Sequence, residues 1–229
     1  MASQRGHAHA GAQEFVPDTG DLAAASRAVQ ECRGCDLYRD ATQAVFGRGA
    51  RHARVLLLGE QPGDSEDRQG EPFVGPAGRL LHKALEEAAI PERDVYLTNA
   101  VKHFRWRPEP HGGKRRIHQR PDAGQVAACR PWWLTEVRLV APEVIVALGA
   151  TAGQALFGSS FRVGASRGKV RDWEVPDDQG DRDEQSKADA TSVPVVATIH
   201  PSAVLRAPER DEMFAGLVED LRAVSRLLG

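Results

Sequence analysis

Four short apolar runs alternate with segments of helical periodicity along this chain. The runs are four or five residues long and free of charge, which predicts buried strands at 55–58, 95–98, 144–148 and 195–199. Helical periodicity predicts helices at 22–31, 78–89, 123–141, 151–157 and 209–228. Pro131 falls inside the third of these helices and predicts a bend or a later start. Alternating strands and helices predict an α/β fold, with three layers (α/β/α) around a central four-stranded parallel sheet.

Each predicted strand is followed at once by residues with distinctive chemistry. GEQPG follows the first strand, NAVKH the second, GATA the third and HPS the fourth. The carboxyl ends of parallel strands share one edge of the sheet, where α/β proteins bind ligands. We therefore expect Glu60, Gln61, Asn99 and His200 to lie near one another. For His200 the structural alternative is a strand-end histidine whose hydrogen bonds are satisfied within the fold.

Three segments lack periodicity and divide the chain. Residues 1–19 predict a flexible tail, which leaves 20–229 as a single domain. Inside that domain, 102–120 forms a basic loop with a local net charge of +6. The segment 172–191 has a local net charge of −6 and predicts a solvated, mobile acidic insertion.

Composition excludes several classes of protein. With 229 residues, 41% of them hydrophobic, the chain can build a sizeable core, so wholesale disorder is excluded. The longest apolar runs fall far short of the roughly 20 residues of a membrane-spanning helix. The N-terminus lacks the apolar region of a signal peptide, and the three cysteines are an odd number, unlike a secreted disulfide framework. We expect a cytoplasmic monomer that binds no membrane.

The formal net charge of −2, taken alone, argues against a nucleic-acid ligand. The total, however, conceals the opposite charges of the basic loop and the acidic insertion. The basic loop interleaves Phe104 and Trp106 with its cations, a pattern typical of nucleic-acid contact, although a charge run can also be a plain solvated surface. The motif KRRIH (114–118) places His118 after Lys114, Arg115 and Arg116. Like charges disfavour the imidazolium form, and a neutral imidazole is a nucleophile.

The cysteines leave several alternatives open. Cys32 and Cys35 form a C-x-x-C pair and Cys129 lies far along the chain. Such a pair serves as a redox dithiol, half of a zinc site or half of an iron–sulfur site, or the thiols are simply buried. The pair follows a helix instead of a strand, which disfavours the thioredoxin-like alternative. A metal site needs a fourth ligand, for which His103 is the candidate.

Two further segments carry candidate binding residues. The loop 59–81 is rich in glycine, including Gly59 and Gly63, and lets backbone approach a ligand, but it lacks the Gly-Lys-Ser/Thr ending of a P-loop. Phe73 in this loop is either a stacking platform for a planar ring or a core residue. In HPSAVLRAP (200–208), Ser202 can cap a short helix. There Leu205 could wedge into a base stack while Arg206 holds phosphate.

Taken together, these motifs resemble the uracil-DNA glycosylase superfamily, in particular its iron–sulfur family-four type. GE-x-PG, PFVG-x-AG-x-LL, TN-x-VK, C-x-PW-x-L and HPS occur in the family's order across about residues 29–228. The chain departs from the pattern in two places. It has His103 where the family has a cysteine, and the linker to the next cysteine is lengthened by the KRRIH loop. Both departures resemble the UdgX group, which becomes covalently attached to uracil-containing DNA through the histidine of that loop.

The resemblance implies an enzyme that excises uracil from DNA, with single strands as the expected substrate, and then links His118 to C1′ of the sugar. It also implies a structural [4Fe–4S] cluster on Cys32, Cys35, His103 and Cys129. Phe73 would stack on uracil, Asn99 would bind the edge of the base and His200 would stabilise the departing anion. The expected catalytic residues are His118, Glu60, Gln61 and His200; the substrate-binding residues are Gly59, Gly63, Phe73, Asn99, Ser202 and Arg206; the DNA-binding residues are Lys114, Arg115, Arg116 and Leu205.

Two other functions compete with this hypothesis. An ordinary family-four glycosylase would release more than one uracil per protein molecule. A non-enzymatic iron–sulfur protein that binds single-stranded DNA would bind uracil and thymine DNA alike, with salt-dependent affinity and no base release.

Overall fold

The computed structural model of the chain describes residues 9–176 and 191–229, apart from the side chain of His111. Its centre is a six-stranded sheet in the order β1-β3-β2-β6-β8-β7. The four middle strands are parallel and correspond to the predicted ones: β3 (Val95–Asn99), β2 (Val55–Gly59), β6 (Val144–Leu148) and β8 (Ser192–Thr198). The predicted central four-stranded parallel sheet is confirmed.

Two antiparallel edge strands extend this sheet and were not predicted. β1 (Arg48–Gly49) pairs with β3, and β7 (Val170–Glu174) pairs with β8. In β7 only Trp173 is buried, so the strand has no apolar run to identify it. The first residues of the predicted acidic insertion therefore belong to a strand, because backbone pairing with β8 outweighs their polarity. Residues 177–190, the larger part of that insertion, lie outside the described residues.

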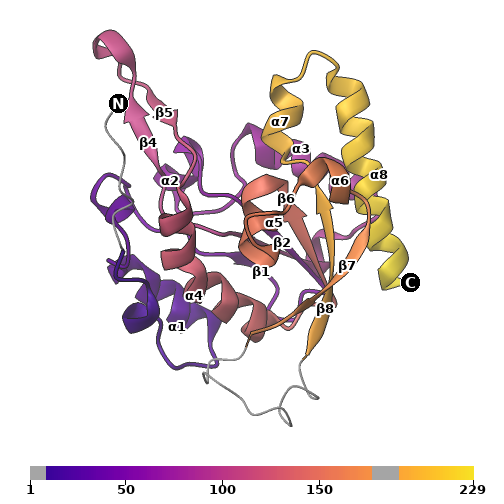
Figure 1. Cartoon of the computed structure of the whole chain (residues 1–229), viewed down its shortest axis with the longest axis horizontal. Helices are drawn as coiled ribbons and strands as arrows, with labels where there is room; N and C mark the ends of the chain where they lie inside the picture. The colour runs from indigo at the N-terminus through magenta and orange to yellow at the C-terminus, as the bar shows by residue number, and fades with distance from the viewer. Residues whose placement is uncertain (1–8, 177–190) are drawn as a thin grey trace.

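Helices cover both faces of the sheet, which confirms the three-layer arrangement (Figure 1). Successive strand residues point to opposite faces, so Leu57 packs toward α3 (Pro76–Glu87) and α8 (Arg210–Leu228), with Leu81 and Leu217. Leu56 packs toward α4 (Ala123–Val140) and α5 (Gly149–Phe157), with Trp133. Both faces are apolar, which explains why these strands read as unbroken hydrophobic runs.

Local signals place the helix ends. Asp21 caps α1 (Leu22–Ala28) by accepting hydrogen bonds from Ala23 N and Ala24 N. Asp122 caps α4 by accepting one from Gln125 N. Helix α4 continues through Pro131, so the predicted later start is wrong. The remaining helical elements are α2 (Asp64–Gln69), α6 (Val163–Ser166), α7 (Pro201–Arg206) and the 3-10 turns Gln13–Phe15, Val29–Glu31, Asp36–Arg39, Glu92–Asp94 and Pro110–Gly112.

Within the predicted N-terminal tail, residues 11–16 pack against the body of the protein, and residues 1–8 lie outside the described residues. Gly11 N donates to Gly34 O at 3.0 Å and Ala12 N donates to Ala128 O at 2.9 Å. Ala12 is buried in a small core that includes the three cysteines. The segment is held by backbone hydrogen bonds, one of them between Gly11 and Gly34. Such bonds leave no hydrophobic periodicity in the sequence.

The basic loop is more regular than expected. It folds into an antiparallel hairpin of β4 (Trp106–Pro108) and β5 (Arg116–His118), in which Trp106 lies opposite His118. The hairpin projects from the body of the molecule on one side of the carboxyl edge of the sheet, and α7 lies on the other (Figure 1).

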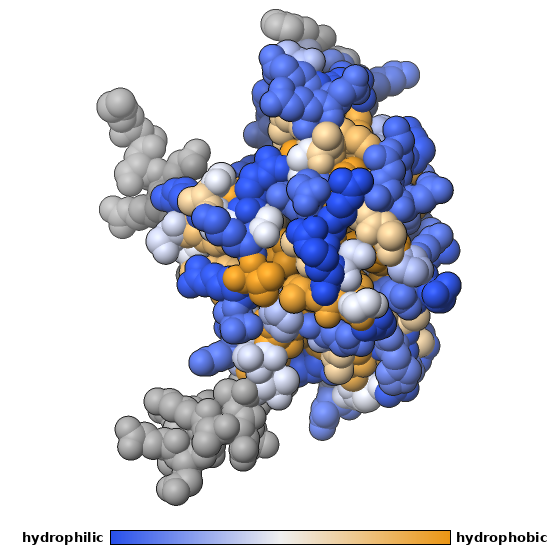
Figure 2. Space-filling model, turned by 90° about the vertical axis from the view of Figure 1, so that its right-hand side faces the viewer, coloured by the Kyte–Doolittle hydropathy of each residue, from blue (hydrophilic) through white to orange (hydrophobic). Residues whose placement is uncertain are grey.

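The surface on the side of α8 is mostly hydrophilic, with apolar side chains exposed near its middle (Figure 2). Within the two described stretches of chain, no helix is long and apolar enough to cross a membrane.

Candidate active site

A cavity of about 530 Å³ opens at the carboxyl ends of the parallel strands. Glu60, Gln61, Asn99 and His200 all line it, in agreement with their expected proximity. The complete lining is Glu60, Gln61, Gly63, Glu66, Phe73, Ala77, Asn99, His118, Arg120, Leu148, Gly149, Ala150, His200, Ser202 and Arg206.

Phe73 forms one wall of this cavity and belongs to the core as well, so its two predicted positions coexist. The residue is buried, has a positive φ of 57°, and its ring centroid lies 6.4 Å from that of His200. Residues other than glycine rarely adopt this backbone conformation, so the surrounding packing must hold Phe73 in it. Gly78 permits the arrangement, because a Cβ at that position would lie 1.7 Å from the Phe73 carbonyl oxygen.

Asn99 ends β3 with its side chain in the cavity. It is buried, and no residue in the described part of the chain hydrogen-bonds to its amide group. A Cβ on Gly59 would lie 2.3 Å from Asn99 Oδ1, so glycine at the end of β2 makes room for this amide. An amide offers one acceptor and two donor hydrogens, which suits the edge of a planar base.

His200 is held in one orientation at the start of α7. The backbone N–H of Ser202 donates to His200 Nδ1 at 3.2 Å, and the Ser202 hydroxyl lies 2.8 Å from the same nitrogen. Nδ1 is thus an acceptor, so the neutral imidazole carries its proton on Nε2. Burial, with the nearby charges of His118 and Arg206, lowers the pKa of His200 to about 4. At neutral pH the residue is a neutral donor toward the cavity.

Gln61 joins the loop after β2 to the hairpin. Arg105 N donates to Gln61 Oε1 at 3.0 Å, which fixes the orientation of the amide. Gln61 Nε2 therefore faces Arg105 O, Gln119 O and, at 2.9 Å, Nε2 of His118. The amide nitrogen only donates and has two hydrogens for these three neighbours, of which His118 Nε2 is the nearest. With His118 as acceptor at Nε2, the neutral imidazole carries its proton on Nδ1.

His118 combines exposure with a lowered basicity. Its side chain is 49% exposed and lies in the cavity, where burial lowers its pKa; the Glu60 carboxylate opposes this shift and the Arg206 guanidinium adds to it. At neutral pH the imidazole is uncharged, with a lone pair on Nε2. This electronic state suits a nucleophile.

Glu60 links His118 to the body of the protein. One carboxylate oxygen lies 3.5 Å from His118 Nε2, and the other accepts a 2.5 Å hydrogen bond from the Thr151 hydroxyl. Arg120 donates to the Thr151 hydroxyl at 3.2 Å and lies 3.8 Å from the same carboxylate. These contacts direct a negative charge toward His118 and the cavity.

Arg116, predicted to contact DNA, is paired with carboxylates of the protein itself, and its contact with DNA stays a prediction. Its guanidinium donates to Asp64 at 2.5 Å and to Asp67 at 2.6 Å, and it packs over the rings of Phe104 and Trp106. Neutralised by two carboxylates, it fixes the hairpin on α2. His118 lies two residues farther along β5.

Ion pairs within the protein neutralise part of the +6 net charge of the basic loop. Lys102 is completely buried and pairs with Glu136 at 2.5 Å beneath β3. Arg105 pairs with Asp122 at 3.1 Å. Within the described ranges, the cations of this segment that are exposed and lack an ion-pair partner are Arg107, Lys114 and Arg115.

Helix α7 carries the other predicted DNA contacts. Arg206 is exposed and lines the cavity, whereas Leu205 is half-buried and lies outside its lining. Both follow His200 on a helix of six residues. Their contact with DNA stays a prediction.

The three cysteine thiols belong to one buried cluster, formed by the N-terminal segment, α4 and the chain after β3. Cys32, Cys35 and Cys129 pack together in a cluster closed by Trp132. Trp132 Nε1 donates to Cys32 Sγ at 3.2 Å, and Lys102 N donates to Cys129 Sγ at 3.2 Å.

His103 is the fourth predicted ligand of this site. It is buried, and burial lowers its pKa to about 4, so its imidazole is neutral. Thiols that receive N–H donors and a neutral imidazole suit a metal centre by chemistry. Among the residues described, however, no three or more His, Cys, Asp or Glu side chains converge into a metal-binding group.

Sequence reasoning missed several residues of the site. Arg120 and Thr151 were not singled out, because an arginine in a basic run and a threonine in GATA give no sign that tertiary structure joins them. Glu66 is a third case. Its carboxylate accepts from Gly63 N at 3.2 Å and Gly75 N at 2.8 Å, which closes the glycine-rich loop around the cavity.

Comparison with known proteins places this architecture in a family. The model of the uracil DNA glycosylase superfamily matches residues 46–222. The chain is 35% identical to a type-4 uracil-DNA glycosylase of Thermotoga maritima, over 86% of this chain and 88% of the relative. It is 32% identical to one of Archaeoglobus fulgidus, over 89% and 91%. The chain belongs to the uracil-DNA glycosylase superfamily.

Proposed function

We propose that this protein excises uracil from DNA. The observation that carries the proposal is one cavity bounded by the Phe73 ring, the Asn99 amide and the Nε2–H of His200. Among the described residues, none occupies that amide with a hydrogen bond. Uracil is planar and presents both carbonyl acceptors and an N–H donor, which these three groups complement. The type-4 relatives, named as uracil-DNA glycosylases, support the same activity.

Bond cleavage follows from the same groups. A uracil turned out of the DNA stack enters the cavity, stacks on Phe73 and pairs with Asn99. The glycosidic electron pair leaves with the base, and the Nε2–H of His200 stabilises the negative charge on uracil O2. The sugar becomes oxocarbenium-like at C1′, and the Glu60 carboxylate stabilises its positive charge.

A second candidate function is covalent capture of the sugar by His118, as in the UdgX group. The specific observation that favours it is the 2.9 Å contact that leaves His118 Nε2 unprotonated beside Glu60. The hydrogen bond from Gln61 to Nε2 breaks, the freed Nε2 lone pair forms the bond to C1′, and the imidazolium so produced loses its Nδ1 proton to solvent. In an ordinary glycosylase, which the relatives' names favour over capture, water attacks C1′ instead.

We also propose that Cys32, Cys35, His103 and Cys129 hold the [4Fe–4S] cluster. The shared burial of the three thiols and their N–H donors support this assignment. The cluster would tie the N-terminal segment to α4 and to the chain after β3, and no reaction step passes through it. The purified protein should contain about four iron and four sulfide ions per chain and show visible charge-transfer absorbance. Zinc alone would refute the assignment.

A denaturing gel with labelled single-stranded DNA tests excision and capture together. We expect a retarded band with uracil DNA and none with thymine DNA. In His118→Ser the band should vanish while free uracil and an abasic site appear. Repeated release of uracil by the unaltered protein, without a retarded band, identifies an ordinary glycosylase. Equal binding of both DNAs without base release identifies a non-enzymatic DNA-binding protein.

A further inference from the structure

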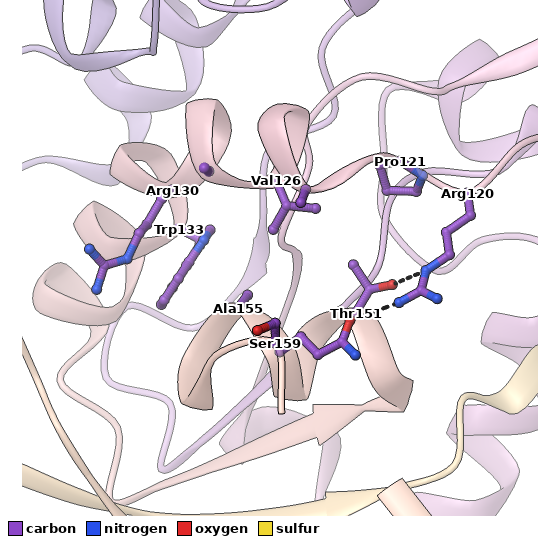
Figure 3. Close-up of a pocket in the computed structure, with 11 residues that line it drawn as sticks. Arg120, Pro121, Val126, Arg130, Trp133, Thr151, Ala155 and Ser159 are labelled. Carbon is purple, nitrogen blue, oxygen red and sulfur yellow. Dashed lines mark hydrogen bonds between the residues drawn. The ribbon is translucent and has the colours of Figure 1, made fainter. Parts of the chain in front are cut away.

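A second cavity adjoins the candidate active site and takes no part in the steps above. It has a volume of about 490 Å³ and lies between α4 and α5 (Figure 3). Arg120 lines both cavities and bonds to Thr151 and Gln154 on α5. A strand whose uracil occupies the first cavity therefore passes close to the opening of the second.

One residue that lines this second cavity carries a buried polar atom without a partner among the described residues. Trp133 is completely buried, and its Nε1 is the one buried side-chain nitrogen or oxygen in the described part of the chain with no hydrogen-bond partner. A buried N–H that lacks an acceptor is unfavourable, and such atoms are rare in folded proteins. Because this atom has almost no accessible surface, an acceptor that enters between α4 and α5 reaches the N–H only after a shift of the indole ring.

The remaining lining is apolar in the middle and cationic at its ends. Val126 and Ala155 face each other from the two helices, while Arg120 and Arg130 lie at opposite ends (Figure 3). Arg130 is exposed and has no ion-pair or hydrogen-bond partner among the described residues. An apolar slot between two guanidinium groups favours a flat, uncharged ring that carries a phosphate.

We propose that this cavity binds a second nucleotide of the DNA strand, next to the excised uracil. Its base lies between α4 and α5 with an oxygen or nitrogen acceptor toward Trp133 Nε1, and its phosphate contacts Arg130. Every DNA base carries such an acceptor, so the subsite tolerates any sequence. The inference rests on the proposed function, since DNA is the substrate that brings a neighbouring nucleotide here.

Affinity for a matched set of oligonucleotides tests the subsite. The probe is a fluorescein-labelled single-stranded 7-mer with one central 2′-fluoro-2′-deoxyuridine, which resists cleavage of the glycosidic bond. Two further 7-mers replace the neighbouring base on the 5′ or the 3′ side by an abasic spacer. The variant Ala127→Leu narrows the opening at an exposed position of α4, and Trp133→Phe removes the indole N–H together with part of the buried ring. Ala215→Leu, exposed on α8, is the matched control.

We expect one of the two spacers to raise the Kd of the unaltered protein about fivefold or more, the size of one lost base contact. Ala127→Leu should raise the Kd for the complete 7-mer by about the same factor. It should not change the Kd for the 7-mer whose spacer removes the base that occupies the second cavity. Trp133→Phe should act in the same direction, and Ala215→Leu should change nothing. Equal affinity of Ala127→Leu and the unaltered protein for the complete 7-mer overturns the proposal, as does an equal loss on all three probes.

Two more measurements separate the alternatives. Free dTMP is titrated by saturation-transfer NMR against the unaltered protein and Ala127→Leu. Binding of dTMP that Ala127→Leu abolishes, with unchanged DNA affinity, assigns the cavity to a free nucleotide and overturns the strand proposal. Base release from ordinary deoxyuridine DNA is measured in parallel. Spacer-dependent affinity without base release refutes the proposed function and leaves the subsite standing.

Discussion

The side-chain amide of Gln61 donates a hydrogen bond to Nε2 of His118 across 2.9 Å, and so connects the loop after β2 with strand β5. The Arg105 backbone N–H bonds to Gln61 Oε1 and fixes which end of the amide faces the imidazole.

Removal of the Gln61 amide should release the His118 ring. In Gln61→Leu we expect covalent capture to slow about tenfold, comparable to the loss of one net hydrogen bond. Rapid-quench assays on denaturing gels measure the rate, with the exposed Gln69→Leu on α2 as control. A rate equal to that of the unaltered protein would contradict this positioning role.

Thr151 should act on the reaction through Glu60. Thr151→Val keeps the shape of the side chain but removes the hydroxyl that donates to Glu60 at 2.5 Å. We expect the maximal rate of uracil release to fall about tenfold with little change in half-saturating DNA concentration, because the carboxylate loses its orientation and not its charge. Thr151→Ser should restore most of the rate. An effect on half-saturation alone would assign Thr151 to DNA binding.

The pH dependence of capture should report on the neutral state of His118. Its pKa is lowered from the usual value near 6.5, so the imidazole is uncharged at pH 7 and gains a proton only at lower pH. Capture should therefore approach a constant rate above neutral pH and decline at lower pH, through a midpoint below 6.5. Base release by His118→Ser should lack this His118 transition and change only where His200 titrates, because burial and Arg206 still keep the pKa of His200 below the usual histidine value in that variant. A capture midpoint above 6.5 would refute the neutral nucleophile.

The buried pair of Lys102 and Glu136 should respond differently to single and double replacement. Both side chains are fully buried, and Thr98 and Gly47 also bond to the carboxylate. Lys102→Met leaves a buried, unpaired charge and should lower the free energy of unfolding by about 3–5 kcal/mol. Adding Glu136→Gln should recover much of this loss, as urea denaturation would measure. No recovery in the double variant would show that packing around Lys102 matters more than its charge.

Gly78 should be essential for the position of Phe73. A methyl group at residue 78 would lie 1.7 Å from the Phe73 carbonyl oxygen, and backbone cannot rotate away as a side chain can. Gly78→Ala should lower stability by about 1–3 kcal/mol and weaken DNA binding through the displaced ring. Gly164→Ala, with open space around its α-carbon, is the control. Unchanged stability and affinity in Gly78→Ala would contradict the tight contact.

Much of this protein is determined by local sequence. The four parallel strands are predictable because both faces of each are buried, so no polar residue interrupts the run. The order of the strands is a tertiary property, but their common direction is enough to bring Glu60, Asn99 and His200 to one edge. The two edge strands escape prediction because each is stabilised by backbone hydrogen bonds to a single neighbour.

The chemical state of the site is decided by tertiary structure. The sequence KRRIH indicates a histidine among cations, yet Arg116 is neutralised by Asp64 and Asp67, residues about fifty positions earlier in the chain. The neutrality of His118 arises chiefly from burial, and its tautomer from Gln61. Charge pairing and desolvation depend on distances between atoms remote in sequence, and only the folded chain sets those distances.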